Sequence, residues 1–138
     1  MLLPMRITLE DLSINADAGR ITAVHPVRPD DEYLSDHFAG FPILPGVLML
    51  ETMVEAARRL LMERDPALGR HVLGRARAVK YGSMVRPGRS LRVEIDLHAE
   101  PEPGVYEFRG VGTVADPDEP EPGSTVSGRF TLRPIRAR

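Results

Sequence analysis

Three residues near the middle of the chain could together perform acid–base chemistry. His37 lies in a segment rich in proline and apolar residues, and Glu51 follows it at a spacing of 14 positions, within a stretch of Val, Leu and Met. Gly46 lies between them at the start of a predicted helix, so its N–H belongs to the unpaired donors at the positive end of the helix dipole. A base, an acid and a donor to a carbonyl oxygen suffice to remove a proton next to that carbonyl.

Residue type and spacing alone leave this chemistry undecided. A single histidine in such a loop is more often a structural hydrogen-bonding residue, and a single glutamate in a helix is usually solvated. A carboxylate inside an apolar helix is costly unless it is paired or neutral, so burial would favour the protonated form of Glu51. Glu55 lies one turn later on the same face and would favour that form further, unless Arg58 and Arg59 neutralise Glu55.

One long helix and about six strands are the elements that must position these residues. Loosely alternating runs at 6–15 and 20–27 flank a turn-like segment at 16–19, and prolines make 28–45 irregular. A helix is predicted from Gly46 to about Arg64, where Asp65 and Pro66 end it. Its first half is apolar on every side and is therefore expected to be buried. Strands are predicted at Val72–Tyr81, Ser90–Ala99, Val105–Ala115 and Ser124–Leu132.

These elements predict an α+β fold in which a mostly antiparallel sheet wraps around a central helix and buries its apolar surface. A chain of 138 residues suits one domain, spanning 1–138.

The net charge of −2 argues against wholesale binding of nucleic acid, and the absence of cysteine excludes disulfides, thiolate zinc sites and a cysteine nucleophile. We find neither a signal peptide nor a membrane-spanning run, so a soluble, cytoplasmic protein is expected.

The stretch from His37 to Glu51 resembles the active-site segment of the bacterial 3-hydroxyacyl-[acyl-carrier-protein] dehydratases of the FabZ type and the related FabA type. Their pattern reads roughly H-F-P-G-x-P-x-x-P-G-V-L-x-x-E-A-M-x-Q. A weaker likeness continues through Val79-Lys80-Tyr81 and through 85–88, so that the resemblance covers about residues 20–115. The first segment matches at His37, Phe38, Gly40, Pro42, Pro45, Gly46, Val47, Leu48, Glu51 and Met53.

This resemblance implies the hot-dog fold, a homodimer and a mechanism without a metal or an organic cofactor. His37 would remove the α-proton of a 3-hydroxyacyl thioester, and Glu51 of the other subunit would protonate the departing hydroxyl. The Gly46 N–H would hold the thioester carbonyl, with Phe38 and Val47 lining the substrate site. His25, His71 and His98 show no metal-ligand spacing and are expected to be structural or surface residues.

The sequence departs from the family pattern at Ala39, Glu55 and Arg89, and its N-terminal element is reduced to Met5–Leu12. That element lies at the mouth of the acyl channel in relatives, so the identity of the acyl group is not implied. Two alternatives therefore stay open. One is a hot-dog hydrolase that cleaves acyl thioesters, and the other is a hot-dog scaffold that binds acyl chains without turnover.

An acyl carrier protein, which is typically acidic, is the partner that the resemblance implies, and related enzymes often form hexamers as trimers of dimers. The charge pattern agrees, because 70–92 contains no acidic residue but several basic ones. Such a one-sign segment in a net-acidic protein suggests a surface for an anionic partner, with Lys80, Arg86 and Arg89 as the predicted carrier-protein patch. Coenzyme A could use the same patch.

Overall fold

The computed structural model describes residues 7–28, 46–82, 85–86, 88–115 and 124–135. The part described contains six strands, one long α-helix and a short 3₁₀ helix. In chain order these are β1 (Glu10–Asn15), β2 (Arg20–Pro26), α2 (Gly46–Arg64), η1 (Pro66–Arg70), β3 (Val72–Tyr81), β4 (Ser90–Glu102), β5 (Val105–Ala115) and β6 (Ser124–Arg133).

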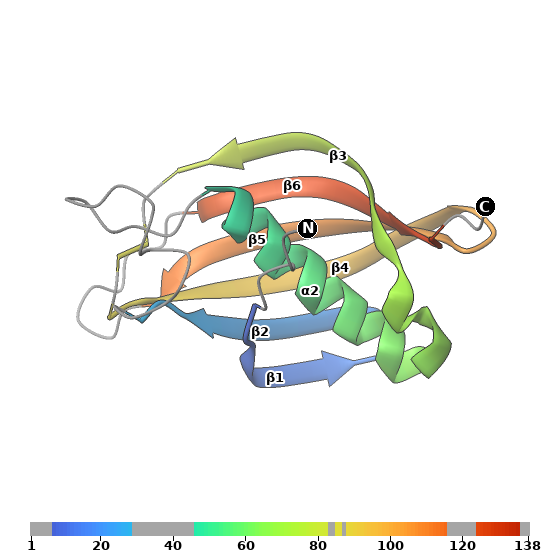
Figure 1. Ribbon diagram of the computed structural model, residues 1–138, viewed down its shortest axis with the longest axis horizontal. Coiled ribbons are helices and arrows are strands. Elements are labelled where there is room, and N and C mark those ends of the chain that lie inside the picture. Colours follow the sequence, from blue (N-terminus) through green and yellow to red (C-terminus); the bar gives the residue numbers. More distant parts are fainter. Residues whose placement is uncertain (1–6, 29–45, 83–84, 87, 116–123, 136–138) are drawn as a thin grey trace, which may run out of the picture.

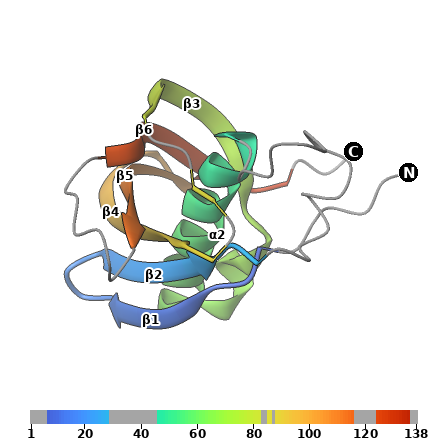
Figure 2. The ribbon, with the colours of Figure 1, turned by 90° about the vertical axis from the view of Figure 1, so that its left-hand side faces the viewer.

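The strands form one sheet in the order β1-β2-β4-β5-β6-β3, and every neighbouring pair is antiparallel. The sheet curves around α2, which lies along its concave face (Figures 1 and 2). This arrangement confirms the predicted α+β fold. The sheet covers α2 from one side, and the strands described leave the opposite side of the helix without a covering element (Figure 2).

The core lies between α2 and the sheet. The helix contributes Met53, Ala57 and Leu60, all with fully buried side chains, and the sheet contributes residues such as Phe108 and Phe130, whose rings stack at 5.5 Å. Burial of this apolar surface is the main force that holds the helix in the sheet.

Gly110 on β5 permits the close approach of helix and sheet. A Cβ atom at this position would lie 2.6 Å from the Met53 Sδ and 2.8 Å from the Ile95 Cδ1. Both neighbouring side chains are fully buried, so a larger residue would force the ends of these side chains to shift within a packed core.

The predicted elements agree closely with those observed, with three differences. Strand β1 begins only at Glu10, although the alternating run that predicted it starts at residue 6. Strand β4 continues past Ala99 through Pro101 to Glu102, and it turns into β5 at Gly104, whose φ of 81° suits glycine. The prediction that the first half of the helix is buried all round is wrong for the single chain, because Val47 is 63% exposed. The sheet contacts α2 on one side only, so its apolar first turn keeps an uncovered side.

No helix in the described ranges combines the length and the apolar character that crossing a membrane requires.

Candidate active site

Gly46 begins α2, as predicted, so its N–H has no acceptor within the helix. A Cβ atom on Gly46 would lie 3.2 Å from Cε1 of Tyr81, at the end of β3. The Tyr81 ring therefore packs against the first turn of the helix, although about half of this side chain is exposed. This contact positions the N-terminus of α2 beside the end of an edge strand.

Glu51 lies on the side of α2 that the sheet leaves uncovered. It is half-buried, and it belongs to a less buried stripe that recurs every three or four residues along the helix. Val47 starts this stripe, and Glu55, Arg59 and Met62 continue it. The Glu51 carboxylate thus projects away from the hydrophobic core of its own chain.

Glu55 is held by two arginines of the same helix. Arg58 donates through Nη1 to Oε1 of Glu55, and Arg59 donates through Nε to Oε2 at 3.3 Å. Of the two possibilities for Glu55, the structure therefore shows the second, in which Arg58 and Arg59 neutralise its carboxylate.

His37 and Phe38 lie outside the described residues, and their relation to Gly46 and Glu51 stays a prediction. The other histidines have the structural and surface roles expected of them. His25 and His71 are buried, and their ring nitrogens lie 2.9 Å from the Thr8 carbonyl oxygen and 2.8 Å from that of Gly104, respectively. The His98 side chain is 41% exposed.

The predicted carrier-protein residues lie in two different places. Lys80 projects from β3 at the surface, whereas Arg86 and Arg89 belong to a turn closed by a hydrogen bond from the Arg89 N–H to the Arg86 carbonyl oxygen. That turn is anchored on Val27, which accepts from Gly88 at 2.8 Å and donates to Arg89 at 2.9 Å. Arg86 is exposed and Arg89 is half-buried.

The sequence analysis missed two groupings of residues, one at the candidate active site and one on the outer face of the sheet. The contact between Gly46 and Tyr81 joins residues 35 positions apart and leaves no trace in local patterns. Arg109 and Arg129 lie beside Lys80, although they lie outside the acid-free run that drew attention to Lys80. To find them from the sequence, one would need the strand order and the alternation of inward and outward side chains along β5 and β6.

Comparison with known proteins identifies the family. A family model described as ApeI-like, ApeI dehydratase, matches residues 13–116, which is well over half of the chain. The chain belongs to the ApeI-like dehydratase family. The stretch from His37 to Glu51 and the helix that carries Gly46 lie within the matched region.

Curated relatives include 3-hydroxyacyl-[acyl-carrier-protein] dehydratases FabZ. The protein of Erythrobacter litoralis is 36% identical over 112 residues, which cover 78% of this chain and 74% of the relative. The protein of Pediococcus pentosaceus is 32% identical over 78 residues, which cover 56% of this chain and 52% of the relative. The chain spans little more than half the length of several of these relatives.

Solved structures share the fold, as the resemblance predicted, and the chain has the hot-dog architecture. A chain of the dehydratase heterocomplex ApeI:P from Xenorhabdus doucetiae superimposes with a TM-score of 0.67 at 18% identity, covering 94% of this chain and 99% of that one. A mutant of the phenylacetic acid degradation protein PaaI from Thermus thermophilus superimposes with a TM-score of 0.60 at 13% identity, over 94% of this chain and 93% of PaaI.

Proposed function

We propose that this protein dehydrates a 3-hydroxyacyl thioester to the trans-2-enoyl thioester in fatty-acid or related lipid biosynthesis. His37 takes the α-proton, and Glu51 gives a proton to the 3-hydroxyl, which leaves as water while the double bond forms. The Gly46 N–H holds the thioester oxygen, where negative charge develops. Phe38 and Val47 line the acyl group. Membership of a dehydratase family is the observation that carries this choice of reaction.

The geometry of α2 supports these roles. Gly46 supplies an N–H free of helical hydrogen bonds, and Glu51 lies little more than one turn further along the same helix. Since Glu51 projects from the side that its own sheet leaves uncovered, its carboxylate is available to a substrate held between two chains.

A homodimer formed at the β3 edge would create such a shared site. Strand β3 is at the end of the sheet order, pairs with β6 on one side, and has a long exposed central stretch from Gly74 to Ala78. A long exposed edge strand presents backbone N–H and C=O groups that can form hydrogen bonds with a strand of a second chain. Val47 and Tyr81, which are 63% and 51% exposed, add apolar surface at the adjoining end of α2. An isologous dimer then makes two equivalent sites, each with His37 from one chain and Glu51 from its partner.

The acyl group would arrive on the phosphopantetheine arm of an acyl carrier protein, the carrier that the names of the FabZ relatives state. Lys80, Arg86 and Arg89 are the basic residues proposed to attract it, because opposite charges steer the encounter of two proteins. A hexamer built as a trimer of dimers is the larger assembly that we propose.

A single assay tests the reaction. The purified protein is incubated with 3-hydroxybutyryl and longer 3-hydroxyacyl thioesters, and the enoyl product and free thiol are both measured. We expect enoyl thioester without thiol release. Free thiol would instead identify a hydrolase, and the absence of both products would identify a scaffold that binds acyl chains without turnover.

A further inference from the structure

A row of charged side chains crosses the outer face of the sheet. In register, Arg20 of β2 faces Asp96 of β4, Asp96 faces Arg109 of β5, Arg109 faces Arg129 of β6, and Arg129 faces Arg77 of β3. Both ends of the row are neutralised. Arg20 Nε lies 2.7 Å from the Asp96 Oδ1, and Arg77 Nη2 lies 2.8 Å from a Glu107 carboxylate oxygen.

The middle of the row keeps an excess of positive charge. Arg109 and Arg129 are direct cross-strand neighbours, a placement that is destabilising for two like charges. Arg109 contacts the imidazole of His98 at 3.4 Å, and its carboxylate neighbour Asp96 is already bonded to Arg20. Within the ranges that the structure describes, neither Arg129 nor Lys80 forms an ion pair.

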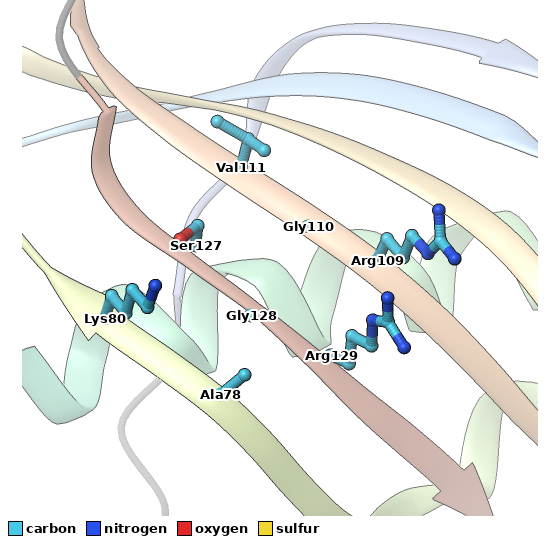
Figure 3. Close-up of a pocket in the computed structure, with 8 residues that line it drawn as sticks. All are labelled: Ala78, Lys80, Arg109, Gly110, Val111, Ser127, Gly128 and Arg129. Carbon is cyan, nitrogen blue, oxygen red and sulfur yellow. The ribbon is translucent and has the colours of Figure 1, made fainter.

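These cationic residues border one depression. Lys80, Arg109 and Arg129 line a shallow, open hollow of about 250 Å³, together with the hydroxyl-bearing Ser127 and the backbone of β5 and β6 (Figure 3). A Cβ atom on Gly110 would point at Met53 of α2, so its neighbour Arg109 projects from the opposite face of the sheet. The depression therefore lies on the side of the sheet away from the helix that carries Gly46 and Glu51.

We propose that this depression binds a phosphate group. Guanidinium groups bind phosphate oxygens in a bidentate manner, and an ammonium group adds a compact charge. The Ser127 hydroxyl can donate one more hydrogen bond. A phosphate monoester carries close to two negative charges near pH 7, which matches the two guanidinium charges of Arg109 and Arg129 and would relieve the repulsion between them. The hollow is open to solvent, so the phosphate can belong to a larger molecule.

Two small-molecule sources share this chemistry, the 4′-phosphate of phosphopantetheine and the nucleotide phosphates of coenzyme A. Binding at this site does not depend on the proposed dehydration, because it is measured without turnover. A failure of the dehydration assay would therefore leave this inference untouched.

The test is a titration of the full chain with inorganic phosphate at constant ionic strength. NMR signals of the arginine Nε–Hε groups are recorded at each step of the titration. We expect the signals of Arg109 and Arg129 to shift together, and chloride to have no such effect. Arg129→Ala should weaken phosphate binding at least about tenfold, the loss expected for one charge-assisted contact, and Arg129→Lys should weaken it less.

Arg133→Ala is the matched control, because it removes an arginine from the same strand as Arg129, four positions further along β6, that does not line the depression. We expect phosphate affinity to be retained in this variant, with unchanged circular dichroism in both alanine variants. Equal weakening by Arg133→Ala and Arg129→Ala would show general charge screening and overturn the site.

A second set of titrations identifies the source. Phosphopantetheine is compared with pantetheine, and adenosine 3′,5′-bisphosphate, the nucleotide part of coenzyme A, is compared with adenosine. Tighter binding of either phosphorylated compound than of its phosphate-free counterpart supports the site, and the compound that binds more tightly identifies the source. No gain from phosphate in either pair would overturn the proposal.

Discussion

At the residue scale, two glutamates on the same stripe of α2, Glu51 and Glu55, differ in their ion pairing within the described residues. The Glu55 carboxylate is bonded to Arg58 and Arg59, and its side chain is 23% exposed. Glu51, one turn earlier on the same stripe, has no ion pair within the part of the chain described. The Glu55 carboxylate is therefore neutralised by arginines of its own helix, and we expect it to have little effect on the proposed role of Glu51.

Glu55→Gln is accordingly expected to leave the pH–rate profile of dehydration unchanged. The substitution should cost about 0.2–0.5 kcal/mol of stability for each helix ion pair lost, measured by chemical denaturation. Glu51→Gln serves as the comparison and should lose turnover. A shift in the acidic part of the pH–rate profile of Glu55→Gln would mean that Glu55 acts on Glu51 despite its arginine partners.

His37→Ala is expected to reduce turnover by at least about a hundredfold, the low end for a general base. Steady-state kinetics with a 3-hydroxyacyl thioester measure this loss, and thermal melting checks the fold. His98→Ala is the matched control, because the side chain of this histidine is 41% exposed and lies beside Arg109 on the outer face of the sheet. Near-normal turnover in His37→Ala would remove this residue from the mechanism.

At the scale of elements, the packing around β5, between α2 and the neighbouring strands, depends on two glycines of this strand. Gly110 and Gly112 face the interior, and a Cβ atom added at either position would meet a buried side chain, at 2.6 and 2.7 Å respectively. Gly110 thus gives room to Met53 of α2, whereas Gly112 gives room to Val126 and Leu91 of the neighbouring strands.

Gly110→Ala should destabilise the protein by about 1–3 kcal/mol, because an added methyl group overpacks the contact with Met53 and Ile95. The free energy of unfolding from urea titration measures this cost. Val111→Ala, the next residue and 44% exposed, is the control and should cost under about 1 kcal/mol. Equal costs in the two variants would show that the helix can shift freely on the sheet.

At the scale of the whole molecule, the proposed homodimer would cover the exposed stripe of α2 and the edge of β3 with a second chain. His37→Ala and Glu51→Ala proteins, each inactive alone, are unfolded and refolded together in equal amounts. Random assortment makes about half of the dimers mixed, each with one intact site, so activity should recover to roughly a quarter of wild type. No recovery, with mixed dimers confirmed by mass, would refute the shared site.

The proposed carrier-protein patch is tested at Arg86, which is exposed. Arg86→Glu should lower kcat/KM for a carrier-protein substrate more than for a short pantetheine thioester, and the difference should shrink as salt is added. Arg133→Glu, at the far end of β6, changes the net charge equally and is the control. Equal losses on both substrate types would exclude a role for Arg86 in docking the carrier.

The sequence by itself determined the elements and the candidate chemistry. Apolar periodicity and turn residues predicted α2 and three of the later strands to within a residue or less at each end, because these signals are local. The motif from His37 to Glu51 indicated the family for the same reason, since its residues are adjacent in the chain. Strand β4 ran further than expected because its antiparallel partner β5 extends it past Pro101.

Only the tertiary structure decided which side of α2 the sheet leaves uncovered, which carboxylate is paired, and which arginines share a surface. An apolar first turn predicted burial of Val47, but the sheet contacts only one side of α2 and leaves Val47 63% exposed. Lys80, Arg109 and Arg129 come together through strand order and register, which join residues far apart in the chain. Such contacts depend on long-range strand pairing, and a local pattern carries no record of it.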